Sequence, residues 1–282
     1  MPEKEPVIQS LDGVSFRLAA PFDFAFLHDF GRVFQVYDDQ DSGNICFGID
    51  DGNQRLFIKF AGAPTVRYAG ETEDAVNRLA QSAKIYQDLQ HEFLIRLRGH
   101  GPLGGGYIVV FDWFDGICLG KQYPEQRKTF LNLPQSAFLQ VFDAIVAFHL
   151  HAASKGYVAI DFYDGSILYD IKRNIPCLCD IDFYRKMPVI NEMGRMWGSS
   201  RFMSPEEFTL GAQIDEITNV FLMGATAFSL FGGELDRSRE KWRLSEQTYQ
   251  VALKAVSPDR SKRYSSISAF MQAWKTALQQ DK

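Results

Sequence analysis

The sequence is poor in cysteine, and its basic residues do not outnumber its acidic ones. Only 4 of the 282 residues are cysteine, and 30 Lys and Arg stand against 35 Asp and Glu, for a formal net charge of −5. The cysteines form no CxxC pair, which argues against a zinc site or a disulfide framework, so we expect reduced core thiols. The acidic balance argues against a nucleic-acid partner recognised by a basic surface.

Long apolar runs and a secretory signal are also missing. The longest apolar stretch, residues 220–231, is shorter than the roughly 18 to 20 residues that cross a bilayer. The first ten residues carry Lys4 between Glu3 and Glu5 and contain no apolar core of a signal peptide. The sequence therefore predicts a cytoplasmic protein with no membrane contact.

Phenylalanine, in contrast, is abundant. The chain has 24 Phe residues, with 46% hydrophobic and 23% charged residues overall. These proportions are typical of a globular protein, and large rings usually fill cores. The length suits one large domain or two lobes.

The first third of the chain has the pattern of strands with one helix. Short β-branched and aromatic runs are separated by turn residues, which predicts hairpins of an antiparallel sheet. The expected strands are 14–20, 32–37, 45–49, 55–60, 93–98 and 107–113. Apolar residues at helical spacing predict one helix over 71–89.

The rest of the chain is mainly helical in its pattern. Helices are expected over 135–154, 214–231, 240–256 and 266–279, with Gly156 ending the first and short strands at 158–160 and 178–181. We therefore predict an α+β protein with an N-terminal extension over 1–13, a strand-rich lobe over 14–113 and a helix-rich lobe over 114–282.

Three polar residues interrupt or end apolar strands, namely Lys59, Asp161 and Asp182. A lysine and two strand-end aspartates suit a metal-bound phosphate substrate, because lysine supplies a point charge and carboxylate oxygens hold magnesium. Each residue also has a simpler interpretation. Lys59 would be an exposed edge residue, and the aspartates would be turn formers.

The order and surroundings of these residues resemble the eukaryotic-type Ser/Thr protein kinase family, over about residues 30–274. The matching motifs are distributed along the chain: Phe57-Ile-Lys59 for V-A-I-K, Asp161 in the catalytic loop, Asp182-Phe183 for the start of D-F-G, Ser204-Pro-Glu206 for A-P-E, residues 219–224 for D-V-W-S-L-G, and Arg263 in the late D-P-x-x-R segment. The resemblance implies a bilobal kinase-like fold. It also implies an interior ion pair of Arg263 with Glu206.

The resemblance assigns the chemistry to four residues. Lys59 would bind the α and β phosphates of ATP, and Asp161 would accept or orient the proton of the attacking hydroxyl. Asp182 would ligate Mg²⁺, and Ser166 stands where the family has a second, metal-binding asparagine. The implied cofactors are ATP and Mg²⁺, and the implied partner is a protein substrate.

Further ATP contacts are implied at two places. Gly31 and Val36 match the phosphate loop, of which Gly31 is the only remaining glycine. Phe111, Asp112 and Phe114 match the interlobe hinge, where backbone near Asp112 and Phe114 would face adenine and Phe111 would close the back of the pocket.

The chain departs from the family at several motif positions. Ser82 stands where the family has the glutamate that pairs with the lysine, and Ile160 replaces the arginine before the catalytic aspartate. Tyr163 replaces the lysine that follows this aspartate, and Tyr184 replaces the glycine of D-F-G. Three functions stay open. The chain is a kinase that transfers the γ-phosphate to Ser or Thr, a pseudokinase that binds nucleotide or a partner, or a small-molecule kinase of the aminoglycoside or choline type.

Overall fold

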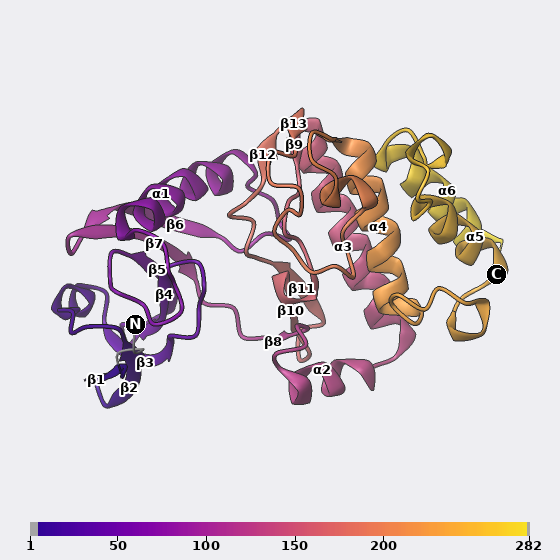
Figure 1. The fold of residues 1–282 in the computed structure, drawn as a ribbon. Coiled ribbons are helices and arrows are strands. Elements are labelled where there is room, and N and C mark those ends of the chain that lie inside the picture. Colours follow the sequence, from indigo (N-terminus) through magenta and orange to yellow (C-terminus); the bar gives the residue numbers. More distant parts are fainter. Residues whose placement is uncertain (1–4, 281–282) are drawn as a thin grey trace. The chain divides into compact units, whose positions relative to one another are not determined.

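The computed structural model describes residues 5–280, which form two compact units (Figure 1). Unit 1 comprises the chain up to Gln90 together with Ile95–Phe114, and unit 2 comprises His91–Leu94 together with the chain from Asp115 on. Unit 1 is rich in strands and unit 2 in helices, so the protein is α+β with antiparallel sheets.

Unit 1 is built on a five-stranded antiparallel sheet with the order β3-β4-β5-β7-β6. Its strands are β3 (Arg32–Tyr37), β4 (Asn44–Asp50), β5 (Arg55–Ala61), β6 (Leu97–Leu103) and β7 (Gly106–Asp112). The sheet therefore places β5, which carries Lys59, at its centre.

Both faces of this sheet are covered. One face bears a core rich in phenylalanine, to which the hairpin of β1 (Val7–Leu11) and β2 (Val14–Leu18) and the short helix η1 (Ala25–Asp29) contribute Phe16, Phe24 and Leu27. Helix α1 (Thr72–Asp88) contacts β5, β6 and β7. Much of the phenylalanine excess is thus packing, and the segment expected as an N-terminal extension contains strand β1.

One strand of unit 1 differs from its prediction. A strand was expected over 93–98, but β6 runs from Leu97 to Leu103. His91–Leu94 belong to unit 2, where Phe93 O accepts a hydrogen bond from Leu178 N at 2.6 Å. An apolar run is compatible with either pairing, so composition alone placed the strand too early.

Unit 2 is organised around two buried helices, α3 (Gln135–Ser154) and α4 (Glu216–Phe231). The other helices are α2 (Pro124–Leu131), α5 (Glu246–Ala255) and α6 (Ile267–Gln279). Rings from α3, α4 and α6 meet in its core, as in the contact of Phe142 with Trp274, whose ring centroids are 4.7 Å apart. Helix α3 has the predicted bounds, and Gly156 follows its end at a φ of +75°.

The remaining helices show what the pattern missed. Helix α5 begins at Glu246 and not at residue 240, because the Ser245 hydroxyl caps it by accepting from Thr248 N at 3.2 Å. Helix α2 was not predicted, since Phe130 is its single buried side chain and it has little apolar periodicity. Helix α4 begins two residues after its predicted start, at the cap Asp215.

Short strands complete unit 2. They are β8 (Ile117–Cys118), β9 (Tyr157–Val158), β10 (Ile167–Asp170), β11 (Ile175–Leu178), β12 (Arg185–Lys186), β13 (Val189–Ile190) and β14 (Gln213–Ile214). The strand expected over 178–181 is β11, which ends where that strand was to begin, and β10 was not foreseen. The prediction of a strand over 158–160 fits β9 in part.

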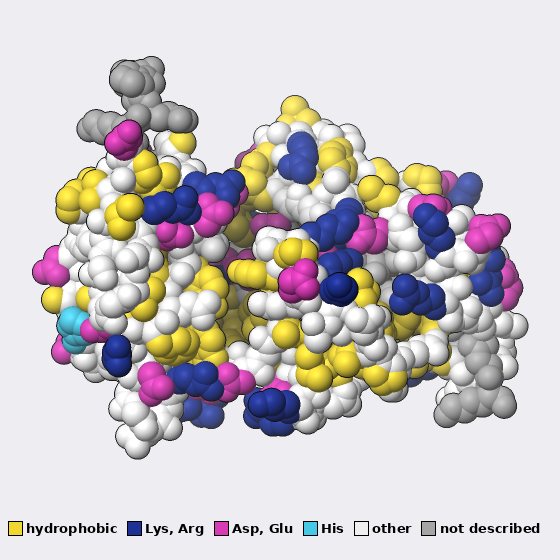
Figure 2. All heavy atoms as spheres, turned by 90° about the horizontal axis from the view of Figure 1, so that it is seen from below, with side chains coloured by type: hydrophobic (Ala, Val, Ile, Leu, Met, Phe, Trp, Pro, Cys, Tyr) yellow, Lys and Arg dark blue, Asp and Glu magenta, His cyan; other side chains and the backbone are white. Residues whose placement is uncertain are grey.

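Among the described residues, α3 is the one helix long and apolar enough to cross a membrane, although 56% of its most apolar window is buried in the protein. Burial in the core of unit 2 accounts for its composition. Figure 2 shows basic and acidic side chains interspersed on one face of the molecule, with apolar side chains between them.

Candidate functional site

The register of two short strands places Asp161 and Asp182 at the same end of a ribbon in unit 2. Strand β9 pairs with β12 antiparallel, with Val158 opposite Arg185. Asp161 follows Val158 by three residues, and Asp182 precedes Arg185 by three. In an antiparallel pair these directions coincide, so both aspartates lie beyond the same end of the ribbon.

A second ribbon adds Ser166 and Asp180. Strands β10 and β11 are antiparallel with Ile167 opposite Leu178, and the pairing continues one step further, where Cys179 N donates to Ser166 O at 2.9 Å. Asp180 therefore lies next to the loop that carries Asp161. The sequence prediction did not include Asp180, although the alternating carboxylates of Asp180 and Asp182 were a visible signal.

Tyr163 lies among these carboxylates. Burial, followed by the charges of Asp180 and Asp161, raises the pKa of its hydroxyl. A Cβ at Gly165 would be 2.4 Å from the Tyr163 ring, so the ring lies over this glycine. Tyr163 is thus a protonated hydroxyl at neutral pH.

Cys118 is not an activated thiol. Burial is the main cause that raises its pKa to about 11, and the charges of Asp164 and Asp180 act in the same direction. A thiol with this pKa stays protonated at neutral pH. Cys118 therefore supplies no nucleophile to this site.

Tyr184 is held in place by a hydrogen bond to the buried side chain of His149. The imidazole of His149 is fully buried, with Nδ1 2.7 Å from Ile145 O and Nε2 2.8 Å from the Tyr184 hydroxyl. A carbonyl only accepts, so Nδ1 carries the hydrogen and Nε2 accepts from Tyr184. Burial lowers the pKa of His149 to about 4 and raises that of Tyr184, so both are neutral. This bond fixes the residue two positions after Asp182.

Asn219 of α4 holds the backbone that leads to Asp161. With its amide oriented to suit both partners, Oδ1 accepts from Ala159 N at 2.9 Å and Nδ2 donates to Ala159 O at 3.2 Å. Asn219 is 1% exposed, so these bonds are shielded from water. Two residues later, Asp161 has a φ of +62°, a conformation that costs a non-glycine residue on the order of 1 kcal/mol. The loop geometry at Asp161 is therefore imposed by its surroundings.

Asp164, three residues after Asp161, is the centre of a buried ionic network. Arg201 binds both of its carboxylate oxygens at 2.8 Å, and Arg127 binds Oδ2 at 2.6 Å. Glu234 accepts from Arg127 Nη2 at 2.8 Å and from Lys121 Nζ at 2.7 Å. The network ties the candidate catalytic loop to α2 and to the segment before Ser204.

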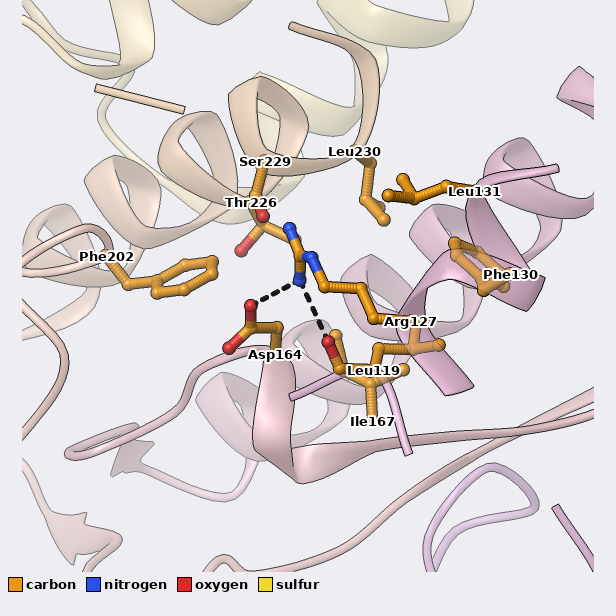
Figure 3. Close-up of a pocket in the computed structure, with 10 residues that line it drawn as sticks. All are labelled: Leu119, Arg127, Phe130, Leu131, Asp164, Ile167, Phe202, Thr226, Ser229 and Leu230. Atoms are coloured by element: carbon orange, nitrogen blue, oxygen red, sulfur yellow. Dashed lines mark hydrogen bonds and ion pairs between the residues drawn. The ribbon is translucent and has the colours of Figure 1, made fainter. Parts of the chain in front are cut away.

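Figure 3 shows how Arg127 reaches this network. Its guanidinium donates to Asp164 and to Leu119 O, at 2.6 and 2.9 Å, and faces Thr226 and Ser229 of α4 across a cavity of about 20 Å³. A space of this size holds about one water molecule. It is therefore a packing void beside the site and too small for a substrate.

The predicted pair of Glu206 and Arg263 is confirmed. The two side chains form a bidentate ion pair, with Nη1–Oε1 at 2.6 Å and Nη2–Oε2 at 2.9 Å, and the Arg263 side chain is 0% exposed. Although burial acts in the opposite direction, the hydrogen bonds and charge of Arg263 lower the pKa of Glu206. The pair fixes the end of the 183–206 segment to the start of α4 and to the residues before α6.

The pKa of the neighbouring carboxyl, Glu207, is shifted in the opposite direction. Its Oε2 accepts from Ser204 N at 2.6 Å and lies 2.9 Å from the Ser204 hydroxyl. Burial outweighs these bonds and raises the pKa of Glu207 to about 7. Glu207 also lines, with Asp161 and Asn219, a closed cavity of about 10 Å³.

Unit 1 holds the predicted ATP-binding residues. Lys59 is 8% exposed on the central strand β5, opposite Cys46 and Val109, which rules out the interpretation as an exposed edge lysine. Phe111 on β7 is 1% exposed and packs edge-on against Tyr86 of α1 at 4.7 Å. Ser82 of α1, at the position of the expected glutamate, is buried and donates to Leu79 O.

The other four predicted residues, Gly31, Val36, Asp112 and Phe114, are half-buried. Gly31 has a φ of +129°, and a Cβ there would be 2.4 Å from Asp50 O, so close backbone packing explains this glycine. Val36 is half-buried at the edge of the phenylalanine core. Asp112 forms an ion pair with Arg98, and Phe114 is half-buried at the end of unit 1.

The donor set of unit 2 fits a magnesium ion that keeps water or ligand oxygens. The hydroxyl of Ser166 is buried with no hydrogen-bond partner in the described part of the chain, and its loop adjoins that of Asp180 and Asp182. Within residues 5–280 no three His, Cys, Asp or Glu side chains are grouped as a metal cage. Mg²⁺ is commonly bound by one or two carboxylates plus substrate phosphates, and these residues suit that mode.

The loops that carry Asp161, Ser166, Asp180 and Asp182 thus all lie in unit 2, next to the two short ribbons. Asp182 occupies a tight turn, closed by Tyr184 N donating to Ile181 O at 3.1 Å, so it is also a turn former. No protein-family model matches the chain, and no similar curated protein was found.

Proposed function

We propose that the protein is an ATP-dependent, protein kinase-like phosphotransferase that transfers the γ-phosphate to a Ser or Thr hydroxyl. The observation that carries the proposal is how the loop that contains Asp161 is held in place. A buried side chain of α4, Asn219, binds both polar backbone groups of Ala159 and positions the loop from inside. Asp161 itself has a φ of +62°, a backbone geometry that the surrounding fold imposes, and a general base requires a fixed position of this kind.

The Glu206–Arg263 pair supports the same function. It holds the segment between Asp182 and α4 at its far end, where the kinase-like motifs place the anchor of the substrate segment. Loss of one partner would leave a buried charge, so the anchor has a single stable arrangement. A fixed segment suits phosphoryl transfer, in which positioning accounts for most of the catalysis.

The roles follow from the residue chemistry. Asp161 accepts or orients the proton of the attacking hydroxyl, and Lys59 on the sheet of unit 1 binds nucleotide phosphates. Asp182 and Ser166 would hold Mg²⁺, which when bound neutralises charge on the phosphates. Tyr163, protonated at neutral pH, supplies a neutral hydrogen-bond donor where the family has a charged lysine.

The direct test is transfer of label from ATP in the presence of magnesium. The purified protein should label itself or a generic protein substrate, and Asp161→Asn should abolish labelling while melting at the same temperature. Asp164→Asn is the matched comparison, because it alters a carboxylate three residues away that serves the ionic network. Labelling that persists in Asp161→Asn would refute the assignment of the base.

A specific observation favours a second function, a pseudokinase that binds nucleotide without transfer. Tyr184 replaces the glycine that follows Asp182-Phe183 and is bonded to the buried His149 at 2.8 Å, which restricts movement of this turn. If this function is correct, ATP raises the melting temperature and no label is transferred. Lys59→Met should remove the thermal shift under both functions, so failure of the shift in the native protein would contradict both.

A further inference from the structure

Arg237 lies in the loop after α4 with its guanidinium between two phenyl rings. Its Cζ is 5.1 Å from the ring centroid of Phe221 and 5.8 Å from that of Phe228. The two phenylalanines are seven residues apart on α4, about two turns, and so lie on one face of the helix. Both rings thus contact the Arg237 guanidinium.

The covered arginines of unit 2 otherwise have carboxylate partners. Ion pairs join Arg127 and Arg201 to Asp164, Arg260 to Asp215 and Arg263 to Glu206. The guanidinium of Arg237 forms no ion pair or hydrogen bond with any residue in 5–280, and its Nε is buried without an acceptor. The adjacent carboxylate, Asp236, is bound to Lys241 Nζ at 2.6 Å.

The phenyl rings do not replace a counter-ion. A ring face attracts a cation by about 0.5 to 2 kcal/mol, but it leaves the in-plane N–H groups without an acceptor. Arginine does not escape by losing its proton, because the guanidinium stays charged at neutral pH. Burial does lower the pKa of Arg237, and no neighbouring carboxylate opposes that shift. Arg237 is therefore a partly desolvated cation for which residues 5–280 provide no anion.

The position of Arg237 is fixed without a ligand. Its backbone carbonyl accepts from the Tyr249 hydroxyl at 2.8 Å, and the Tyr249 ring packs edge-on against Phe228 with centroids 6.0 Å apart. Of the guanidinium nitrogens only Nε is buried without a partner, so the two terminal nitrogens remain accessible. A preorganised cation loses little entropy when it binds an anion.

We propose that Arg237 anchors a carboxylate-binding site for a peptide segment of a protein partner. Two terminal N–H groups in one plane match the two oxygens of a carboxylate. A phosphate dianion would be less well matched by a single cation on a chain of net charge −5. Leu235, two residues earlier, is 61% exposed and offers an apolar contact of the kind that a peptide uses and a free ion does not.

The test uses short peptides and follows the ring-proton NMR signals of Phe221 and Phe228. The probes are acetyl-Leu-Glu-Leu-amide, its Gln counterpart as an amide, the same Gln peptide with a free C-terminus, and inorganic phosphate. The Glu peptide or the Gln peptide with a free C-terminus should shift the signals in a saturable way. A shift with the first indicates a side-chain carboxylate as the ligand, and a shift with the second indicates a terminal carboxylate. The Gln amide should not shift them.

Variants assign the effect to Arg237. Arg237→Met keeps most of the packing between the rings, and its affinity for the carboxylate probe should fall at least tenfold. Arg239→Met, two residues away and with a side chain that is 41% exposed, should bind the probe as the native protein does. Equal shifts in Arg237→Met, no shift with either carboxylate probe, or tighter binding of phosphate would overturn the proposal.

A stability measurement separates a binding cation from a structural one. Arg237→Met should melt at the same temperature as the native protein or higher, because it removes an uncompensated charge. A fall of several degrees would show that Arg237 serves the fold and would also overturn the proposal. No nucleotide is present in these experiments, so their outcome is independent of the phosphotransferase proposal.

Discussion

Arg263 and Arg237 place their guanidinium groups 5.0 and 5.1 Å from the ring centroid of the same residue, Phe221, but only Arg263 has a carboxylate partner. All three guanidinium nitrogens of Arg263 donate within the chain, to Glu206, Ser257 O and Ile217 O. Around Arg237 the rings are present, and no carboxylate in the described part of the chain pairs with it. The same contact of a guanidinium with a phenyl ring thus occurs in two regions. We call the region around Arg263 and Glu206 closed, because its charges are paired within the protein, and the region around Arg237 open.

The difference distinguishes residues that stabilise the fold from residues that face outward. A fully buried cation must be neutralised by the protein itself, since water cannot reach it. A half-buried cation is tolerated without a partner because its outer edge stays hydrated, and that edge is free to bind. Four substitutions test this comparison, in order of decreasing effect.

The largest effect is expected for Glu206→Gln in the closed region. It leaves the 0% exposed Arg263 side chain without a counter-charge, and the free energy of unfolding should fall by about 3–5 kcal/mol. Urea denaturation measures the loss. Removing both charges, with Glu206→Leu and Arg263→Met together, should cost less than Glu206→Gln alone. A loss below about 1 kcal/mol would mean that water reaches the pair.

A pH-dependent effect is expected at the adjacent Glu207. Its pKa is raised to about 7 from a usual value of 4.5, so between these pH values the folded state keeps a proton that the unfolded state has lost. The contribution of Glu207 to stability is therefore present below pH 4.5 and is lost as the pH rises through 7. At 1.36 kcal/mol per pKa unit, the loss is roughly 3 kcal/mol.

The measurement is the free energy of unfolding of Glu207→Gln and of the native protein from pH 5 to 8. The difference between them should grow in favour of the variant as the pH rises and level off above 7. His149, with a pKa lowered to about 4, destabilises both proteins alike as the pH falls below 6.5, so it cancels in the difference. A difference that does not change with pH would contradict the assignment.

A smaller loss is expected for Asn219→Ala. The change removes the acceptor and the donor that bind Ala159 and should cost about 1–3 kcal/mol of unfolding free energy, because two buried backbone groups lose their partners. Asn219→Asp retains the acceptor but not the donor. It should be less stable than the native protein at pH 7 and recover as the pH falls and the carboxyl takes a proton. Equal stability of native protein and Asn219→Asp at pH 7 would show that the donor is not needed.

The smallest effect is expected in the open region, for Arg239→Met. Arg239 pairs with Glu246 at 2.7 Å, but both side chains are more than 40% exposed. Exposed pairs contribute about 0.2–1 kcal/mol, so a change within that range is expected by thermal or urea unfolding. A loss of 3 kcal/mol would remove the distinction between the two regions.

Local patterns predicted much of the chain and failed at identifiable places. Helix α3 and strand β3 have the predicted bounds, since apolar spacing and the flanking turn residues were unambiguous. The predicted start of α5 was six residues early, because the Ser245 cap was overlooked. The motif spacing led to the Glu206–Arg263 pair, and it also identified the Asp161 and Asp182 loops, whose proximity follows from strand pairing.

The sequence by itself determined the division into strand-rich and helix-rich parts, the burial of most phenylalanines and the candidate polar residues, because each depends on periodicity or composition within a few neighbours. Only the tertiary structure decided that Asn219 supports the Asp161 loop, that Asp164 binds Arg201, and that Arg237 contacts two rings but pairs with no carboxylate of residues 5–280. The physical reason is that pairing of charges depends on which distant segments meet. An arginine has the same sequence pattern whether the fold brings it a carboxylate or leaves its outer edge in water.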